Sequence, residues 1–267
     1  MRKLALASLV TLVLLSSVGS CIATSSNFYT RDGEKYDNWS LCRTRCWRED
    51  GFFQVHNTTF RPAIAFESLG ELKNTAWEVG EGLAERYSGN ELAKQIFDYV
   101  RDHVIYTSDS IQFAYDEFAR NADEVAEEIE SNGSSRGDCE DYAVLLAVMF
   151  KAAGFRSAVV LAPEHAAALV YLPGYPGANA FWDFRGEGGW IWAEATGRTN
   201  PLGWTPPELM RSDLLAYEIG EEPVLEGEGK SEKLATSGGG GQMFFGGSSF
   251  FSMLLFLWML SLFKRRR

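Results

Sequence analysis

The chain has 267 residues, of which 46% are hydrophobic and 23% are charged, and its formal net charge is −11. This length is enough for one ordinary hydrophobic core with a small addition. We expect no nucleic-acid partner, because nucleic-acid binding depends on basic groups that displace counterions, and this chain is acidic.

Residues 1–20 have the pattern of a secretory signal peptide. A basic start precedes an apolar run over residues 4–18, which is short for a membrane span; an uncleaved anchor is the alternative. Residues 18–21, Val-Gly-Ser-Cys, resemble a bacterial or archaeal lipobox, in which Cys21 would become the lipidated first residue. Cleavage nearby without lipidation is the other outcome.

Residues 21–60 are predicted to form a polar, irregular N-terminal extension. Cys42 and Cys46 lie within it, in the segment Cys-Arg-Thr-Arg-Cys. Outside the cytoplasm, a disulfide between them is the default expectation. A metal site that also uses His56 is the alternative, although a zinc site needs four ligands and no further residue is spaced to be the fourth.

Residues 61–217 are predicted to form the folded domain, which begins with helices. Residues 62–86 form a helical stretch, and a clearer helix follows Asn90, its expected cap. The apolar residues of that second helix recur at spacings near 3.6: Leu92, Ile96, Phe97, Val100 and Val104. Residues 121–131 are predicted to be a short acidic helix, and residues 131–137 a loop.

A buried helix and several strands complete the domain. Residues 142–153 are apolar nearly all round, which is typical of a buried helix, and Gly154 would end it as a left-handed cap. Short strands are predicted at residues 155–161, 165–172, 180–185 and 190–193. A central helix followed by sequential strands predicts an α+β fold with the helix packed on an antiparallel sheet.

The C-terminal part of the chain is predicted to be a membrane anchor. Residues 218–242 are acidic, then Gly-rich, which is typical of a solvated linker. Residues 243–263 carry no charge and as a helix would span about 31 Å, which matches a bilayer core. The basic residues 264–267 favour the cytoplasmic side, so the domain would lie outside. A processed C-terminal sorting signal or a buried helix are the alternatives.

Cys139 is the candidate nucleophile. It lies in Gly-Asp-Cys-Glu-Asp, where the loop meets the buried helix. The free N–H groups and the dipole of a helix N-terminus favour the thiolate, which is the nucleophilic form of cysteine. A structural cysteine is the alternative, but the carboxylates on both sides of Cys139 are unusual for a core position.

His165 and Glu194 are the candidate partners of Cys139. Among His56, His103 and His165, only His165 begins a strand that the helix and the following turn can bring back to Cys139. A thiolate and an imidazole are the minimum pair for acyl transfer, and a carboxylate that orients the imidazole completes a triad. Glu194 ends a later strand and can serve as that carboxylate. A strand-edge histidine and a solvated carboxylate are the alternatives, and we expect His103 to be a surface or packing residue.

Together these segments resemble the transglutaminase-like superfamily in their order and spacing over residues 90–200. The likeness rests on Gly137-Asp138-Cys139, on Gly154-Phe155-Arg156 as the family's Gly-hydrophobic-Arg junction, on His165-Ala166 as its His-Ala-Trp, and on Glu194-Ala195-Thr196 as its Asp-Pro-Thr. The resemblance implies a papain-like core fold and a Cys-His-acid triad. It also suggests a bacterial or archaeal protein of the membrane-anchored type.

The resemblance makes Cys139 the nucleophile, His165 the base and Glu194 the orienting acid. The backbone N–H of Cys139 is the natural first donor to an oxyanion. Two positions depart from the family pattern, since Ala167 replaces an aromatic residue and Glu194 replaces Asp. The longer side chain of Glu194 can shift the imidazole, and Asp183 is the next candidate for its role.

The sequence therefore predicts an exported enzyme that cleaves or transfers an acyl group through a thioester on Cys139. Its substrate would be a protein, a peptide or a cell-envelope polymer, with hydrolysis preferred to transamidation and with no metal or organic cofactor required. Trp190 and Trp192 would shape the site or serve as core aromatics. The alternative is a catalytically silent module that binds peptide or wall polymer, but the presence of both Cys139 and His165 argues against it.

Overall fold

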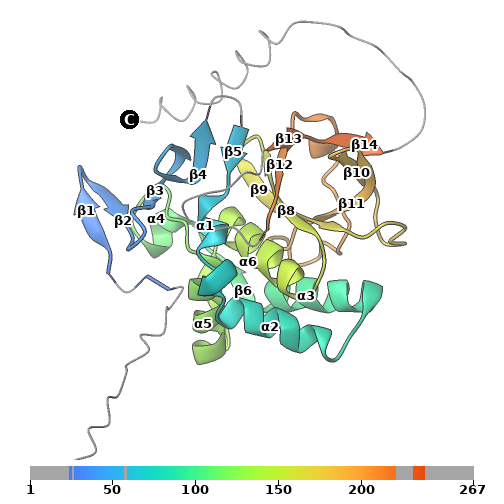
Figure 1. The fold of residues 1–267 in the computed structure, drawn as a ribbon, viewed down its shortest axis with the longest axis horizontal. Coiled ribbons are helices and arrows are strands. Elements are labelled where there is room, and N and C mark those ends of the chain that lie inside the picture. Colours follow the sequence, from blue (N-terminus) through green and yellow to red (C-terminus); the bar gives the residue numbers. More distant parts are fainter. Residues whose placement is uncertain (1–23, 26, 57–58, 221–230, 238–267) are drawn as a thin grey trace, which may run out of the picture.

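The computed structural model describes most of the chain between residues 24 and 237 (Figure 1). The described residues are 24–25, 27–56, 59–220 and 231–237. Among them there is no helix of the length and apolar character needed to span a bilayer. The predicted signal peptide with Cys21, the apolar segment 243–263 and the basic residues 264–267 all lie outside the described residues.

A buried helix, α6 (Cys139–Ala152), occupies the centre of the molecule (Figure 1). All its residues from Glu140 to Phe150 are buried, because α6 packs against helices on one side and against strands on the other. Gly154 follows with a φ of +86°, a conformation that favours glycine. The predicted buried helix and its glycine stop are confirmed.

Three longer helices cover α6: α2 (Thr75–Ala84), α3 (Gly89–His103) and α5 (Ala122–Asn132). Helix α2 crosses α6 closely, since a Cβ at Gly80 would lie 2.7 Å from the carbonyl oxygen of Met149. Asn121 caps α5 through a reciprocal capping box with Glu124. The predicted short acidic helix is therefore confirmed.

The predicted helical stretch 62–86 is divided in the structure. It consists of α1 (Ala63–Phe66), the 3₁₀ turn η1 (Gly70–Leu72) and α2. The next helix, α3, starts one residue before the predicted cap Asn90, and Ser88 occupies the cap position. Its last predicted apolar residue, Val104, instead begins the strand β6 (Val104–Tyr106).

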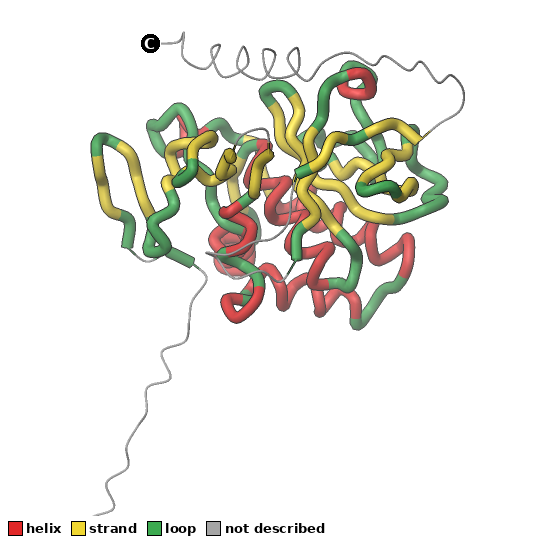
Figure 2. Tube along the Cα trace, turned by 45° about the horizontal axis from the view of Figure 1, so that its top comes forward, coloured by secondary structure: helices red, strands yellow, loops and turns green. Residues whose placement is uncertain are grey.

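The strands that follow α6 belong to a seven-stranded antiparallel sheet with the order β13-β12-β8-β9-β11-β10-β14. The strands are β8 (Ser157–Ala162), β9 (His165–Tyr171), β10 (Phe181–Phe184), β11 (Glu187–Ala193), β12 (Leu215–Glu218), β13 (Glu232–Lys233) and β14 (Ala235–Ser237). Figure 2 shows the helices gathered on one side of these strands. The four predicted strands and the antiparallel sheet are confirmed, so the α+β interpretation holds.

The segment 231–237 bridges the two edges of this sheet. Strands β13 and β14 pair with opposite edge strands, β12 and β10, although only Leu234 separates them in the chain. The sheet must therefore curl round until its edges approach. The predicted linker 218–242 is wrong for the described residues 218–220 and 231–237. Glu218 ends β12 and Ile219 is buried, while residues 231–237 pair with the sheet edges. Residues 221–230 and 238–242 lie outside the described residues.

The curled sheet separates two apolar clusters. Along β8, Val159 and Leu161 face the cluster around α6, whereas Ala158, Val160 and Ala162 face a second cluster inside the curl, as strand alternation requires. Four large aromatic side chains fill that second cluster: Trp182, Phe184, Trp190 and Trp192. Trp190 and Trp192 are fully buried there, so they are core residues and do not shape the site around Cys139.

The N-terminal part forms a second sheet with the order β1-β2-β3-β4-β5. Its strands are β1 (Tyr29–Arg31), β2 (Glu34–Tyr36), β3 (Cys42–Arg48), β4 (Gly51–His56) and β5 (Thr59–Arg61). Phe52, Phe53 and Phe60 extend from it into the cluster around α6. The prediction of an irregular extension over residues 21–60 is therefore wrong for the described strands, because these aromatic side chains anchor the segment to the core.

The predicted disulfide between Cys42 and Cys46 does not form, and both thiols are free. The two residues lie four positions apart on one strand, β3. Such residues are about 13 Å apart in a regular strand, whereas a disulfide needs Cα atoms within about 7 Å. The side chain of His56, the third member of the alternative metal site, lies outside the described residues.

Candidate active site

Cys139 is the first residue of α6, and the preceding strand delivers it there. Strand β7 (Ser135–Gly137) pairs in parallel with β6. Gly137 lies against the first turn of α6, where a Cβ would come within 2.6 Å of an Asp141 carboxylate oxygen. Asp141 in turn accepts a hydrogen bond from the Arg120 backbone N–H at 2.9 Å. The start of the helix is therefore held by packing on both sides.

His165 begins β9, directly after a tight turn. Strands β8 and β9 are joined by two residues, with Ala162 paired to His165, and Glu164 in that turn has a φ of +55°. The backbone N–H of Ala166, the residue after His165, interacts with the thiol of Cys139. The first residues of β9 and of α6 are therefore neighbours, as the sequence predicted.

Glu194 follows β11 and contacts His165. Strand β11 pairs with β9, which places the residue after Ala193 beside the start of β9. Oε2 of Glu194 contacts Nε2 of His165. The other oxygen, Oε1, accepts hydrogen bonds from the hydroxyl and the backbone N–H of Thr196. Glu194 is only 4% exposed, and both of its oxygens contact protein groups. The carboxylate is therefore held in place and can orient the imidazole.

The alternative acid and the other described histidine lie elsewhere. Asp183 is on β10, opposite Gly188 of β11, and the carboxylate that contacts His165 is that of Glu194. His103 stacks on the ring of Tyr99, and its Nδ1 contacts the Tyr99 carbonyl oxygen at 2.8 Å. It therefore has the packing role expected of it.

The resting state of Cys139 differs from the expectation based on its helix position. Burial, followed by the negative charges of Glu140 and Asp138, raises the pKa of the Cys139 thiol well above its ordinary value, while the Ala166 N–H acts in the opposite direction. The thiol donates to Oε2 of Glu140 at 3.3 Å. Burial and adjacent carboxylates thus act against the thiolate expected at a helix N-terminus, and they favour the neutral thiol.

A group of buried carboxyls next to Cys139 was not predicted from the sequence. Burial, followed by neighbouring carboxylates, raises the pKa of Asp109 to about 8 and that of Glu117 to about 7. Burial, followed by a hydrogen bond with the Asp138 side chain and by neighbouring carboxylates, raises the pKa of Glu140 well above its ordinary value. Asp109 and Glu117 lie more than twenty positions before Cys139 outside any motif, so the sequence carries no signal that would bring them there.

The family assignment rests on a sequence comparison. A family model described as the transglutaminase-like superfamily matches residues 74–208, just over half of the chain. The chain belongs to the transglutaminase-like superfamily. Members of this superfamily are generally enzymes of the cysteine peptidase or acyltransferase kind. The matched residues include the whole transglutaminase-like constellation described above, from Cys139 to Glu194.

Other comparisons add little to this transglutaminase-like assignment. Among solved structures, the chain is similar to a protein from Parabacteroides distasonis named "putative protease", with 17% sequence identity and a TM-score of 0.34. The similarity covers 60% of this chain and 30% of that one, so this chain spans less than a third of that protein's length. No curated protein matches the chain.

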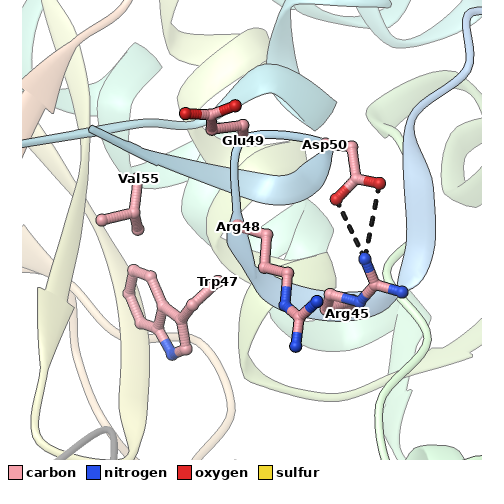
Figure 3. Close-up of a pocket in the computed structure, with 6 residues that line it drawn as sticks. All are labelled: Arg45, Trp47, Arg48, Glu49, Asp50 and Val55. Atoms are coloured by element: carbon pink, nitrogen blue, oxygen red, sulfur yellow. Dashed lines mark hydrogen bonds and ion pairs between the residues drawn. The ribbon is translucent and has the colours of Figure 1, made fainter.

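One open pocket lies apart from the transglutaminase-like triad, on β3 and β4 (Figure 3). It has a volume of about 640 Å³ and is lined by Arg45, Trp47, Arg48, Glu49, Asp50 and Val55. An ion pair between Arg45 and Asp50 spans one side of it. Because none of the triad residues lines this pocket, it is not the place where Cys139 would meet a substrate.

Proposed function

We propose that the protein is a cysteine hydrolase of the peptidase or amidase kind that works through a thioester on Cys139. The observation that carries this proposal is the contact between Nε2 of His165 and Glu194 at the start of the strand beside Cys139. With Nε2 directed at the carboxylate, Nδ1 is the nitrogen left to receive a proton from the thiol.

The chemistry follows from these roles. Nδ1 of His165 takes the Cys139 proton as the sulfur attacks the substrate carbonyl carbon, and the backbone N–H of Cys139 donates to the oxyanion. The carbon–nitrogen bond then breaks, and the imidazolium returns the proton to the departing amine. Water, deprotonated by the same imidazole, attacks the thioester and releases the acid and the thiol. Glu194 stabilises the imidazolium in both halves.

The raised pKa of the Cys139 thiol favours proton transfer during attack over a pre-formed ion pair. The thiol would then lose its proton to the imidazole only as the sulfur attacks the bound substrate, which is general-base assistance.

An apolar rim beside the site supports a polymeric substrate, such as a protein, a peptide or a cell-envelope polymer. The side chain of Tyr106 is 56% exposed and lies within electrostatic reach of Cys139 and Glu194. Ile105 and Ile111 nearby in the chain are also exposed. Exposed apolar side chains next to a reactive group are typical of a binding surface.

The proposed location is the outer face of a membrane, with the protein held by the C-terminal segment; a lipid on Cys21 would be a second, separate anchor. The support is in the sequence alone: the pattern of a signal peptide over residues 1–20, the uncharged residues 243–263 and the basic residues 264–267.

The test uses the full chain and a peptide aldehyde or peptidyl electrophile of the kind that traps nucleophilic cysteines. Intact-mass analysis should show one adduct, mapped to Cys139, and release of an amine from a peptide-amide library should depend on the same residue. His165→Ala should abolish both, and His103→Ala is the matched control. A binding module without activity would instead retain peptide without forming an adduct or releasing amine.

A further inference from the structure

The acidic group beside α6 draws carboxylates from three separate segments. Asp109 begins the short helix α4 (Asp109–Gln112), Glu117 lies in the loop that follows, and Glu140 is in the first turn of α6. One carboxylate oxygen of each lies within 4.8 Å of those of the other two. Asp138 and Glu140 form an overlapping group with the sulfur of Cys139.

Two of these carboxylates have a buried oxygen without a partner. Asp109 is 2% exposed and Glu140 is 4% exposed. One oxygen of each is used, since Asp109 Oδ2 accepts the Phe118 N–H at 2.5 Å and Glu140 Oε2 accepts from Cys139. The remaining oxygens, Asp109 Oδ1 and Glu140 Oε1, have no hydrogen-bond donor among the described residues. The side chain of Glu140 also interacts with the carboxylate of Asp138, whose Oδ1 is likewise without a donor. Buried polar atoms are nearly always satisfied, so these oxygens need a ligand or a proton.

No cationic side chain of the described residues forms an ion pair with this group. The nearest candidate by sequence, Arg120, is paired with Glu128 at 2.7 Å and with Asp141 at 3.2 Å. The described neighbours that act on Asp109 and Glu140 are chiefly other carboxylates. Close like charges in a buried place repel strongly, and a bound cation would remove that repulsion.

We propose that Asp109, Glu117 and Glu140 bind a divalent cation of the Ca²⁺ or Mg²⁺ kind. All three donors are carboxylate oxygens, which these hard cations prefer. Oxygens on opposite sides of a Ca²⁺ ion are about 4.6–5.2 Å apart, which is compatible with the 4.8 Å limit on the separations here. Glu117 is only half-buried, which leaves a side from which water can complete the coordination.

Such an ion would fasten the segment of residues 107–118 to the start of α6. It would do so next to Cys139 but without using the thiol or the triad. This inference is independent of the proposed hydrolase chemistry, because binding can be measured without any substrate.

The experiment is calorimetric titration of the full chain, freed of metal by a chelator and then dialysed, with CaCl₂ and separately with MgCl₂ up to about 10 mM, a range that includes weak extracellular calcium sites. We expect one ion per chain for at least one of the two metals. Thermal unfolding in the presence of that metal should move to higher temperature, since a ligand that binds only the folded state stabilises it.

Matched variants locate the site. Asp109→Asn keeps an oxygen for the Phe118 N–H but replaces the unpartnered one, and it should weaken binding at least tenfold. Glu117→Gln changes a half-buried loop residue and should also weaken cation binding at least tenfold. It replaces Asp109→Asn as the test variant if Asp109→Asn does not fold. Asp116→Asn removes an exposed charge next to Glu117 and should change the affinity by less than about twofold, since exposed charges interact weakly.

Two results would overturn the proposal. One is the absence of saturable binding and of a thermal shift with both metals in the wild-type chain. The other is equal affinity in the wild type, Asp109→Asn and Glu117→Gln. Either result would mean that the carboxyls are satisfied by protons, and neither would bear on adduct formation at Cys139.

Discussion

At the scale of single residues, catalysis would depend on the way in which the two carboxylate oxygens of Glu194 contact different residues. One of its oxygens contacts His165 and the other is held by Thr196. The extra methylene relative to Asp therefore does not prevent the contact with the imidazole. The carboxylate is held on two sides, so its orientation is set by the fold and not by solvent.

Glu194→Gln tests that role. We expect kcat/KM to fall by a factor of about 10² to 10⁴, because an amide no longer favours the correct tautomer or stabilises the imidazolium. The isosteric side chain should keep its contact with Thr196, so thermal stability should change little. Asp183→Asn is the control and should keep wild-type turnover. Wild-type activity in Glu194→Gln would remove Glu194 from the mechanism.

The reactivity of Cys139 provides a second residue-scale prediction. The thiolate fraction of a cysteine rises with pH and reaches one half at the pKa. The raised pKa of Cys139 therefore moves the onset of alkylation to higher pH. In the presence of a chelator at pH 6–7, Cys139 in the folded chain should alkylate with iodoacetamide more slowly than in the denatured chain. Peptide mapping separates it from the other cysteines.

Glu140→Gln should reverse part of this effect. Both the charge of Glu140 and its hydrogen bond with the thiol raise the pKa of Cys139. Removal of that carboxylate therefore lowers the pKa of the thiol and increases the thiolate fraction at pH 7. Alkylation of the folded variant at pH 7 should therefore be faster than that of the wild type. Faster alkylation of the folded wild type than of its denatured form would instead support the thiolate expected from the helix dipole.

At the scale of elements, a buried arginine joins the N-terminal sheet to the helices. Arg43 on β3 is fully buried and binds Asp37 at 2.7 Å, Glu67 at 2.7 Å and Glu124 at 2.8 Å. Glu67 follows α1 and Glu124 belongs to α5. Loss of one partner in such a network leaves buried charges uncompensated, which is more costly than loss of a surface pair.

Arg43→Met should therefore lower the free energy of unfolding by at least about 3 kcal/mol. Arg45→Met on the same strand is the control. Arg45 is only partly buried in its ion pairs with Glu34 and Asp50, and its loss should cost about 1 kcal/mol or less. Urea unfolding of both variants measures the difference, and equal midpoints would show that the Arg43 network adds no net stability.

At the scale of the whole molecule, the curled sheet closes with a segment from near the C-terminus. Residues 231–237 pair with both edges of the sheet, and the Phe60 N–H of the N-terminal sheet donates to the Ser231 hydroxyl at 2.8 Å. The end of the described chain is thus part of the fold. A tether to the membrane, as proposed, would begin only after Ser237.

Limited proteolysis of intact cells, or of spheroplasts where an outer membrane is present, tests the proposed topology. Protease added outside should release a soluble fragment that ends after Ser237 and keeps the reactive Cys139, since low-complexity tethers are readily cut. If Cys21 carries a lipid, the cut fragment should stay with the membrane until detergent is added. Full protection in both preparations would show that the proposed orientation is wrong.

Local patterns in the sequence determined a large part of this protein. The apolar residues of α6, the stop at Gly154, the strands β8 to β11 and the capping box at Asn121 all follow from periodicity and from backbone preferences of neighbouring residues. The order of the Cys139, His165 and Glu194 motifs also predicted that they meet, because His165 begins β9 and Glu194 follows β11, and these two strands pair.

Only the tertiary structure decided the features that depend on contacts between distant segments. It joined β13 and β14 to opposite edges of one sheet, directed Trp190 and Trp192 into the curl, and separated Cys42 from Cys46. It also placed Asp109 and Glu117 beside Glu140. Burial and the field of neighbouring charges are properties of that three-dimensional arrangement, and for this reason the motif around Cys139 predicted the nucleophile but not the protonation state in which it rests.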